Sequence, residues 1–182
     1  MRLGTGSGFL DRATPHAQPP RFLADAMLGR LARWLRVLGF DTRYEPALTD
    51  PELVALARRE GRVLLTRDRR LLSDLRPDLA LEVTSDAPLA QLRAVIEHLA
   101  LAPPAELFTR CLLCNTPLEP VPRTEAAALL PPAARELPGP VRRCPTCERV
   151  YWPGSHARRM RSALRSALPA WLLPERPGEL PP

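Results

Sequence analysis

The sequence contains no lysine, so all 26 of its basic residues are arginine, and isoleucine occurs only at Ile96. Both scarcities, together with many Ala, Leu and Pro residues, are what a GC-rich genome produces, so the formal charge of +6 is a weak indicator of function. The distribution of charge along the chain is more informative than its total. Residues 21–100 hold 13 Arg and 12 acidic residues, whereas residues 101–182 hold 11 Arg and 7 acidic residues. The basic excess therefore lies in the C-terminal part of the chain.

Long apolar runs are missing as well. No window approaches the roughly 20 apolar residues of a membrane span, and the first 20 residues lack the apolar core of a signal peptide. We therefore expect a cytoplasmic protein with no membrane partner. In that compartment the only four cysteines, arranged as two Cys-x-x-Cys pairs, indicate a metal site rather than disulfides.

What the sequence does contain is sufficient for a folded core, since 45% of its 182 residues are hydrophobic. That length allows one medium domain, or one small domain with an appendage. Pro103-Pro104 marks the expected boundary. The expected parts are a flexible leader at 1–20, an α/β domain at 21–102, a zinc ribbon with a basic C-terminal helix at 105–168, and a disordered Pro-rich tail at 169–182.

Apolar runs alternate with amphipathic stretches throughout residues 21–102. This alternation predicts a mostly parallel sheet covered by helices. The expected strands are 21–24, 42–44, 62–66 and 79–84, and the expected helices are 27–38, 50–60 and 88–101.

Two aspartates follow buried strands directly: Asp25 ends the first apolar run and Asp68 follows the third. Parallel strands deliver their carboxyl ends to one edge of the sheet, where ligands bind. Oxygen-only ligand sets suit Mg²⁺ or Mn²⁺. Asp50 precedes Pro51 and Glu52 at the start of the second helix, where it fits either as an N-cap or as a third metal ligand.

The cysteines form Cys111-Leu-Leu-Cys114 and, after 29 intervening residues, Cys144-Pro-Thr-Cys147. Two such pairs predict a four-cysteine zinc site in which each pair occupies a tight turn. A site of this kind is closed to water, so we expect zinc to be structural. The segment between the pairs, TEAAALLPPAARELPGP, is expected to be a surface excursion.

Arginines mark two helices as candidate RNA contacts. Arg30, Arg33 and Arg36 lie off the apolar stripe of the first helix, as either a solvated face or a strip that faces phosphate. The last helix follows Tyr151-Trp152 and is basic without an acidic residue, as is typical of a nucleic-acid contact; the alternative is a surface helix that packs its apolar side inward. Its basic residues are His156, Arg158, Arg159, Arg161 and Arg165.

Taken together, FLADAMLGRLARWLRVLGFDTRYE, GRVLLTRDRRLL, the two cysteine pairs and YWPGSHARRM resemble the mut-seven C-terminal RNase domain over about residues 21–168. The resemblance implies a PIN-like α/β/α sandwich of three layers with a zinc ribbon appended. It also implies a ribonuclease that requires Mg or Mn.

In this resemblance Asp25 matches the acid at the end of the first strand and Asp68 the acid of the TRD motif. Asp50, with Glu52 as a substitute, matches the acid at the start of an intervening helix. Arg67 of the TRD motif is a candidate to contact phosphate.

A further acid, two residues after TRD in many PIN-like sequences, is replaced here by Arg70. Asp74 and Asp41 are the substitutes that the sequence offers. The departure at Arg70 keeps an alternative open, in which the chain is a zinc-ribbon RNA-binding protein with a degenerate nuclease-like domain. A toxin ribonuclease is disfavoured by the zinc ribbon, and a phosphatase that uses Asp25 as nucleophile is disfavoured by the absence of lysine.

Overall fold

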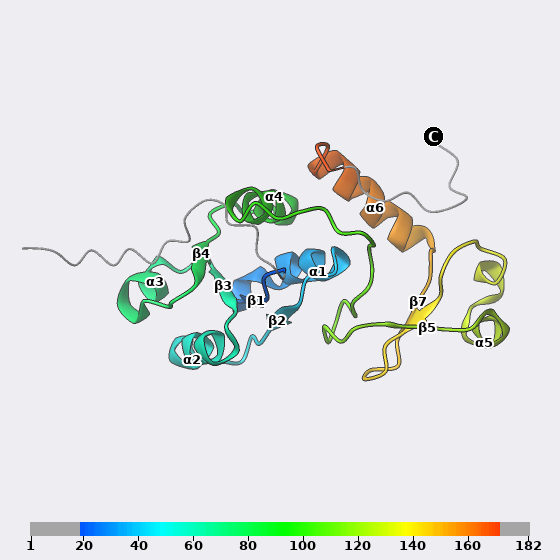
Figure 1. Ribbon diagram of the computed structural model, residues 1–182, viewed down its shortest axis with the longest axis horizontal. Helices are drawn as coiled ribbons and strands as arrows, with labels where there is room; N and C mark the ends of the chain where they lie inside the picture. The colour runs from blue at the N-terminus through cyan, green and yellow to red at the C-terminus, as the bar shows by residue number, and fades with distance from the viewer. Residues whose placement is uncertain (1–18, 172–182) are drawn as a thin grey trace, which may run out of the picture. The chain divides into compact units, whose positions relative to one another are not determined.

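A computed structural model of the chain describes residues 19–171 (Figure 1). Most of the expected leader (1–20) and tail (169–182) lies outside these residues. The described chain divides into two compact units. The α/β unit comprises residues up to Leu35 and Phe40–Ala102, and the cysteine unit comprises Arg36–Gly39 and the chain from Pro103 onward.

The α/β unit is built on a four-stranded sheet in the order β2-β1-β3-β4, and every neighbouring pair is parallel. The predicted parallel sheet is therefore confirmed. Its register places Ala24 of β1 beside both Tyr44 of β2 and Leu65 of β3. The strands are β1 (Phe22–Ala24), β2 (Thr42–Tyr44), β3 (Val63–Thr66) and β4 (Ala80–Glu82).

Helices cover both faces of this sheet. Figure 1 shows α2 and α3 on one side and α1 and α4 on the other, which is the expected three-layer arrangement. The helices are α1 (Gly29–Val37, preceded by the 3-10 turn Ala26–Leu28), α2 (Asp50–Glu60), α3 (Arg69–Leu75) and α4 (Pro88–His98). Helix α3 was not predicted. It supplies the crossover that a parallel β3–β4 pair requires.

The two central strands explain why the sequence shows unbroken apolar runs rather than alternation. All residues of β1 and β3 are buried, because helices cover both faces of these strands. Leu23 and Leu64 pack against Leu53 and Val54 of α2 and against Leu71 of α3. Each fully buried leucine contributes about 1.5–3 kcal/mol relative to exposure.

The amino edge of the sheet is held by a buried arginine. Arg62 is 6% exposed, and its guanidinium group donates to Asp41 Oδ1 (2.7 Å) and to Glu60 Oε2 (2.6 Å). It also donates to the carbonyl oxygen of Phe22 (3.1 Å), which joins the start of β1 to the start of β3. The hydrogen bond from Arg62 lowers the pKa of Glu60 below its ordinary value, against the opposing effect of burial.

The cysteine unit contains three two-residue antiparallel strands in the order β5-β6-β7 and a long final helix. Segment 36–39 belongs to this unit because Arg36 donates to the carbonyl oxygens of Leu112 (3.0 Å) and Leu113 (2.8 Å). The elements are β5 (Glu119–Pro120), α5 (Arg123–Leu129), the 3-10 turn Pro132–Ala134, β6 (Arg142–Arg143), β7 (Val150–Tyr151) and α6 (Ser155–Ala167).

The segment between the two cysteine pairs is mostly exposed, as expected of a surface excursion, and it also has a small core of its own. Ala126, Leu130 and Ala134 are buried in a small cluster of their own. Val150 and Trp152 pack against this cluster. Elsewhere in the unit, Gly39 follows the end of α1: its φ is +85°, and an added Cβ would lie 2.7 Å from Thr109 Oγ1.

None of the helices within residues 19–171 combines the length and the apolar character needed to cross a membrane.

Candidate metal and nucleic-acid sites

Asp25 and Asp68 come from adjacent strands at the carboxyl edge of the sheet. Asp25 follows β1 directly, and Asp68 lies two residues beyond β3. The side chain of Thr66, the last residue of β3, connects them: its Oγ1 donates to Asp25 Oδ2 (2.7 Å) and accepts from the backbone N–H of Asp68 (2.9 Å). One buried hydroxyl therefore fixes the first carboxylate relative to the turn that carries the second.

Asp68 also begins α3. Its Oδ1 accepts from the backbone N–H groups of Arg70 (2.7 Å) and Leu71 (3.2 Å), as an N-cap does. Among the described residues, the hydrogen bonds of Asp25 and Asp68 each use a single carboxylate oxygen. The other oxygen of each carboxylate remains for a ligand.

Asp50 is not the N-cap of α2, so that prediction was wrong. Thr49 is the N-cap, and Glu52 completes a capping box by accepting from Thr49 N (2.9 Å) and Thr49 Oγ1 (2.7 Å). The backbone hydrogen bond from Thr49 is the main reason why the pKa of Glu52 lies below its ordinary value. Glu52 is thereby committed to the cap, while Asp50 is an exposed residue in the first turn.

The three predicted acids do not form one tight cluster. Within residues 19–171, the only group of three or more Cys, His, Asp or Glu side chains at metal-ligating separation is the cysteine group. The substitutes for a fourth acid lie elsewhere. Asp41 is bound to Arg62 at the opposite, amino edge, and Asp74 lies near the far end of α3, roughly 9 Å along the helix from Asp68.

Sequence reasoning missed Asp86, which follows β4 on the carboxyl side of the sheet and forms an ion pair with Arg67. The rule that selected Asp25 and Asp68, an acid shortly after an apolar strand, also applies to Asp86. Its carboxylate is 87% exposed, so the pair with Arg67 is a surface interaction.

The predicted arginines of α1 separate into two groups. Arg30 and Arg33 are exposed, as a phosphate-facing strip requires. Arg36 is only 5% exposed and is engaged with the carbonyl oxygens of Leu112 and Leu113. The strip therefore consists of two arginines rather than three.

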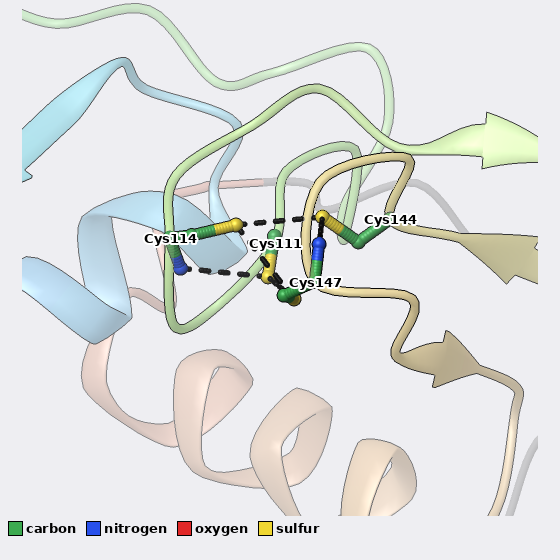
Figure 2. A group of neighbouring side chains, drawn as sticks. All are labelled: Cys111, Cys114, Cys144 and Cys147. Carbon is green, nitrogen blue, oxygen red and sulfur yellow. Dashed lines mark hydrogen bonds between the residues drawn. The ribbon is translucent and has the colours of Figure 1, made fainter.

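The four cysteines converge as predicted, and Figure 2 shows the two pairs facing each other from two loops. The Sγ atoms are 3.5 Å apart for Cys111 and Cys147, 3.4 Å for Cys114 and Cys144, and 3.7 Å for Cys114 and Cys147. A tetrahedral zinc ion with bonds of about 2.3 Å requires sulfur–sulfur separations of about 3.8 Å. The group thus has the composition and size of a zinc tetrathiolate.

The electrostatics of the cysteine group also favour a cation. Burial raises the pKa of Cys114, but hydrogen bonds with Thr116 and the neighbouring thiols outweigh burial and bring it to about 6. The backbone hydrogen bond from Arg149 lowers the pKa of Cys147, but burial and the other three cysteines raise it to about 12. Four thiolates so close together repel one another, and a divalent ion relieves that repulsion while releasing protons.

Four of the five basic residues of helix α6 are exposed, and they include the predicted RNA contacts Arg158 and Arg159. Arg158 and Arg159 are exposed, while Met160 and Leu164 are buried on the other side of the helix. Arg161 is only 9% exposed, and its guanidinium group lies 5.5 Å from the centre of the Phe108 ring. This arginine is therefore part of the interior of the cysteine unit and not of the exposed basic face.

A parallel α/β unit with acids at its carboxyl edge, followed by a four-cysteine unit, is consistent with a PIN-like nuclease domain and its zinc-binding appendage. The sequence model of the Mut7-C RNAse domain matches residues 20–164, and the chain belongs to that family. The resemblance noted in the sequence is thereby confirmed, and the family indicates a nuclease-like role with RNA as the substrate class. Searches of curated proteins and of solved structures return no match.

Proposed function

We propose that the protein is a metal-dependent ribonuclease that hydrolyses RNA phosphodiester bonds at the carboxyl edge of its parallel sheet. Asp25, Asp50 and Asp68 are the proposed ligands of Mg²⁺ or Mn²⁺. The observation that carries this proposal is the Thr66 hydroxyl, which binds Asp25 and the backbone of Asp68 at once. It organises two carboxylates on neighbouring strands without using all their oxygens.

The donor set fits a hard cation. Mg²⁺ commonly uses one or two protein carboxylates and completes its octahedron with water and substrate phosphate. Asp25 and Asp68 meet that requirement on their own. Asp50, which is exposed at the start of α2 and does not cluster with them, is the proposed third ligand and would reach the ion through one of its water molecules. A bound divalent ion supplies an activated water and neutralises charge on the phosphoryl oxygens.

The arginines have complementary roles. Arg30 and Arg33 are exposed on the helix that follows Asp25, so they neutralise RNA phosphates beside the acids. Arg67 leaves Asp86 for a phosphate at low cost, because an exposed ion pair contributes about 1 kcal/mol or less. In the cysteine unit, Arg158 and Arg159 provide a second contact with RNA.

The proposed zinc ion, bound by Cys111, Cys114, Cys144 and Cys147, is structural. Four thiolates fill its tetrahedral shell, so no position remains for a reacting water. Its role is to stabilise the turns that precede α6.

The test is cleavage of end-labelled single-stranded and structured RNA by zinc-loaded protein, with Mn²⁺ or Mg²⁺ titrated. Asp25→Asn and Asp68→Asn should lower the rate by on the order of 10³-fold, because each removes several kcal/mol of charge stabilisation. Asp78→Asn is the matched control, since Asp78 is an exposed aspartate paired with Arg58. Equal cleavage by all four proteins would reject the proposal.

In the part of the chain that the structure describes, no third carboxylate clusters with Asp25 and Asp68, which favours one alternative, an RNA-binding protein without nuclease activity. Arg70, next to the Asp68 cap, is consistent with that function because it adds positive charge where an acid is expected. RNA binding that persists in EDTA, with no cleavage at any Mn²⁺ concentration, would establish this alternative.

A further inference from the structure

Tyr151 ends β7 beside the first cysteine pair. Its hydroxyl oxygen lies 3.1 Å from Cys111 Sγ and 3.0 Å from the backbone nitrogen of Leu112. The side chain is half-buried, and Cys111 is completely buried. Tyr151 therefore contacts the cysteine cluster from its interior side.

The chemistry of the two contacts fixes the direction of the hydrogen bonds. The backbone N–H of Leu112 can only donate, so the tyrosine oxygen accepts from it. A metal-bound cysteine is a thiolate, which can only accept, so the hydroxyl proton must point to Cys111 Sγ. Once metal is bound, the side chain has one acceptor and one donor role, and both are satisfied.

We propose that Tyr151 is a positioning residue of the zinc site, whose O–H donates to the Cys111 thiolate and strengthens retention of the metal. This inference rests on the proposed zinc binding. A zinc ion with four thiolates carries a net charge of about −2, which buried surroundings stabilise poorly without donors. Loss of a residue that hydrogen-bonds to a metal ligand typically lowers metal affinity by about 10- to 100-fold.

The backbone N–H of Cys114 also donates to Cys111 Sγ, at 3.5 Å, and the Tyr151 hydroxyl lies closer to the same sulfur, at 3.1 Å. The nearby Arg110 cannot take the place of the hydroxyl, because it donates to the carbonyl oxygens of Gly39 and Asn115. Water is excluded because Cys111 is 0% exposed. By contrast, Cys114 is exposed, and its Sγ lies 3.3 Å from Thr116 Oγ1. If the Thr116 hydroxyl is removed, water can therefore take its place as hydrogen-bond partner of Cys114.

The experiment compares wild type, Tyr151→Phe, Thr116→Ala and Tyr44→Phe. Tyr44 is the other tyrosine of the chain, and its hydroxyl donates to the Ala26 carbonyl oxygen far from any cysteine in sequence, so it controls for loss of a structural hydrogen bond. Zinc affinity is measured by competition with a chromophoric chelator. Tyr151→Phe should bind zinc about 10- to 100-fold more weakly, Thr116→Ala should lose less, and Tyr44→Phe should match wild type.

Cobalt provides the readout that a merely structural role would not change. Loss of a hydrogen bond to a thiolate raises the energy of its electrons, so the sulfur-to-cobalt charge-transfer band of Tyr151→Phe should shift to longer wavelength. A chain with para-aminophenylalanine at position 151 retains a donor and should recover both affinity and band position. This rescue also tests the proposal if Tyr151→Phe fails to fold.

The outcomes separate the two proposals. Wild type that binds neither zinc nor cobalt would overturn the zinc site itself. If wild type binds zinc or cobalt and Tyr151→Phe has the same affinity and the same spectrum, only the proposed role of Tyr151 is overturned. Weaker binding with an unshifted band, or no recovery with para-aminophenylalanine, would show that the tyrosine acts through packing alone.

Discussion

The two units differ in what stabilises their folds. The α/β unit has a parallel sheet whose central strands are buried on both faces, and its apolar clusters include whole helix faces. The cysteine unit has strands of only two residues. Its buried apolar side chains comprise a three-residue cluster around Ala126 and others that include Leu107, Met160 and Leu164. We expect burial to be enough for the first unit, whereas a unit with so little regular structure usually requires a metal.

The largest expected effect is the loss of zinc from the cysteine unit. Under the proposed zinc binding, chelation, or Cys144→Ser at a completely buried proposed ligand, should lower the stability of the folded unit by a binding free energy on the order of 10 kcal/mol. Hydrogen exchange should become fast across β5–β7 and α6 while β1 and β3 stay protected. Loss of protection in both units together would contradict the distinction between them.

A core truncation should have the opposite pattern. Leu64→Ala removes a fully buried side chain between β3 and the α2–α3 layer, at a cost of about 2–5 kcal/mol. Denaturant unfolding should show the α/β unit destabilised while zinc affinity stays unchanged. Met27→Ala is the control, because that side chain is 67% exposed and its loss should cost about 0.5 kcal/mol or less.

Removal of the Thr66 hydroxyl should affect stability and activity together. Thr66→Val keeps the shape but leaves the Asp68 N–H and Asp25 Oδ2 without this partner, at a cost of about 1–3 kcal/mol. Thr66→Ser should retain most of both properties. Cleavage by Thr66→Val at the wild-type rate would show that the bridge does not position the acids.

The smallest effect concerns pH. The pKa of Glu60 is lowered by its hydrogen bond from Arg62, so its contribution to stability is complete above its unfolded-state pKa of about 4.5 and is lost as the pH falls through the lower folded-state pKa. Glu60→Gln should therefore reduce the acid sensitivity of the α/β unit by about 1 kcal/mol or less. If wild type and Glu60→Gln show the same dependence of unfolding free energy on pH, Glu60 does not contribute to the acid sensitivity of the α/β unit.

The strand ends were predictable because apolar runs buried on both faces are distinctive and the aspartates follow them within two residues. The Thr66 bridge was not, since it depends on the register that places Ala24 beside Leu65. The N-cap of α2 could have been predicted from the sequence. Thr49-x-x-Glu52 is the capping-box pattern, and it favours Thr49 over Asp50 as the N-cap.

Arginine burial could not be predicted from helical position. Arg36 and Arg161 each have long apolar stems and lie near the edge of an apolar stripe, where tertiary packing decides which way the side chain turns. Arg36 donates to carbonyl oxygens of the Cys111–Cys114 turn, and the Arg161 guanidinium group packs over the Phe108 ring. Helix α3 escaped prediction because it has only seven residues.

The most direct test of the central claim is manganese binding to zinc-loaded protein, measured by electron paramagnetic resonance on the samples used for RNA cleavage. We predict that wild type and Asp78→Asn bind Mn²⁺ and cut RNA, and that Asp25→Asn and Asp68→Asn lose both properties. Unchanged Mn²⁺ binding in Asp25→Asn and Asp68→Asn would contradict the assignment of the metal site to the carboxyl edge of the sheet.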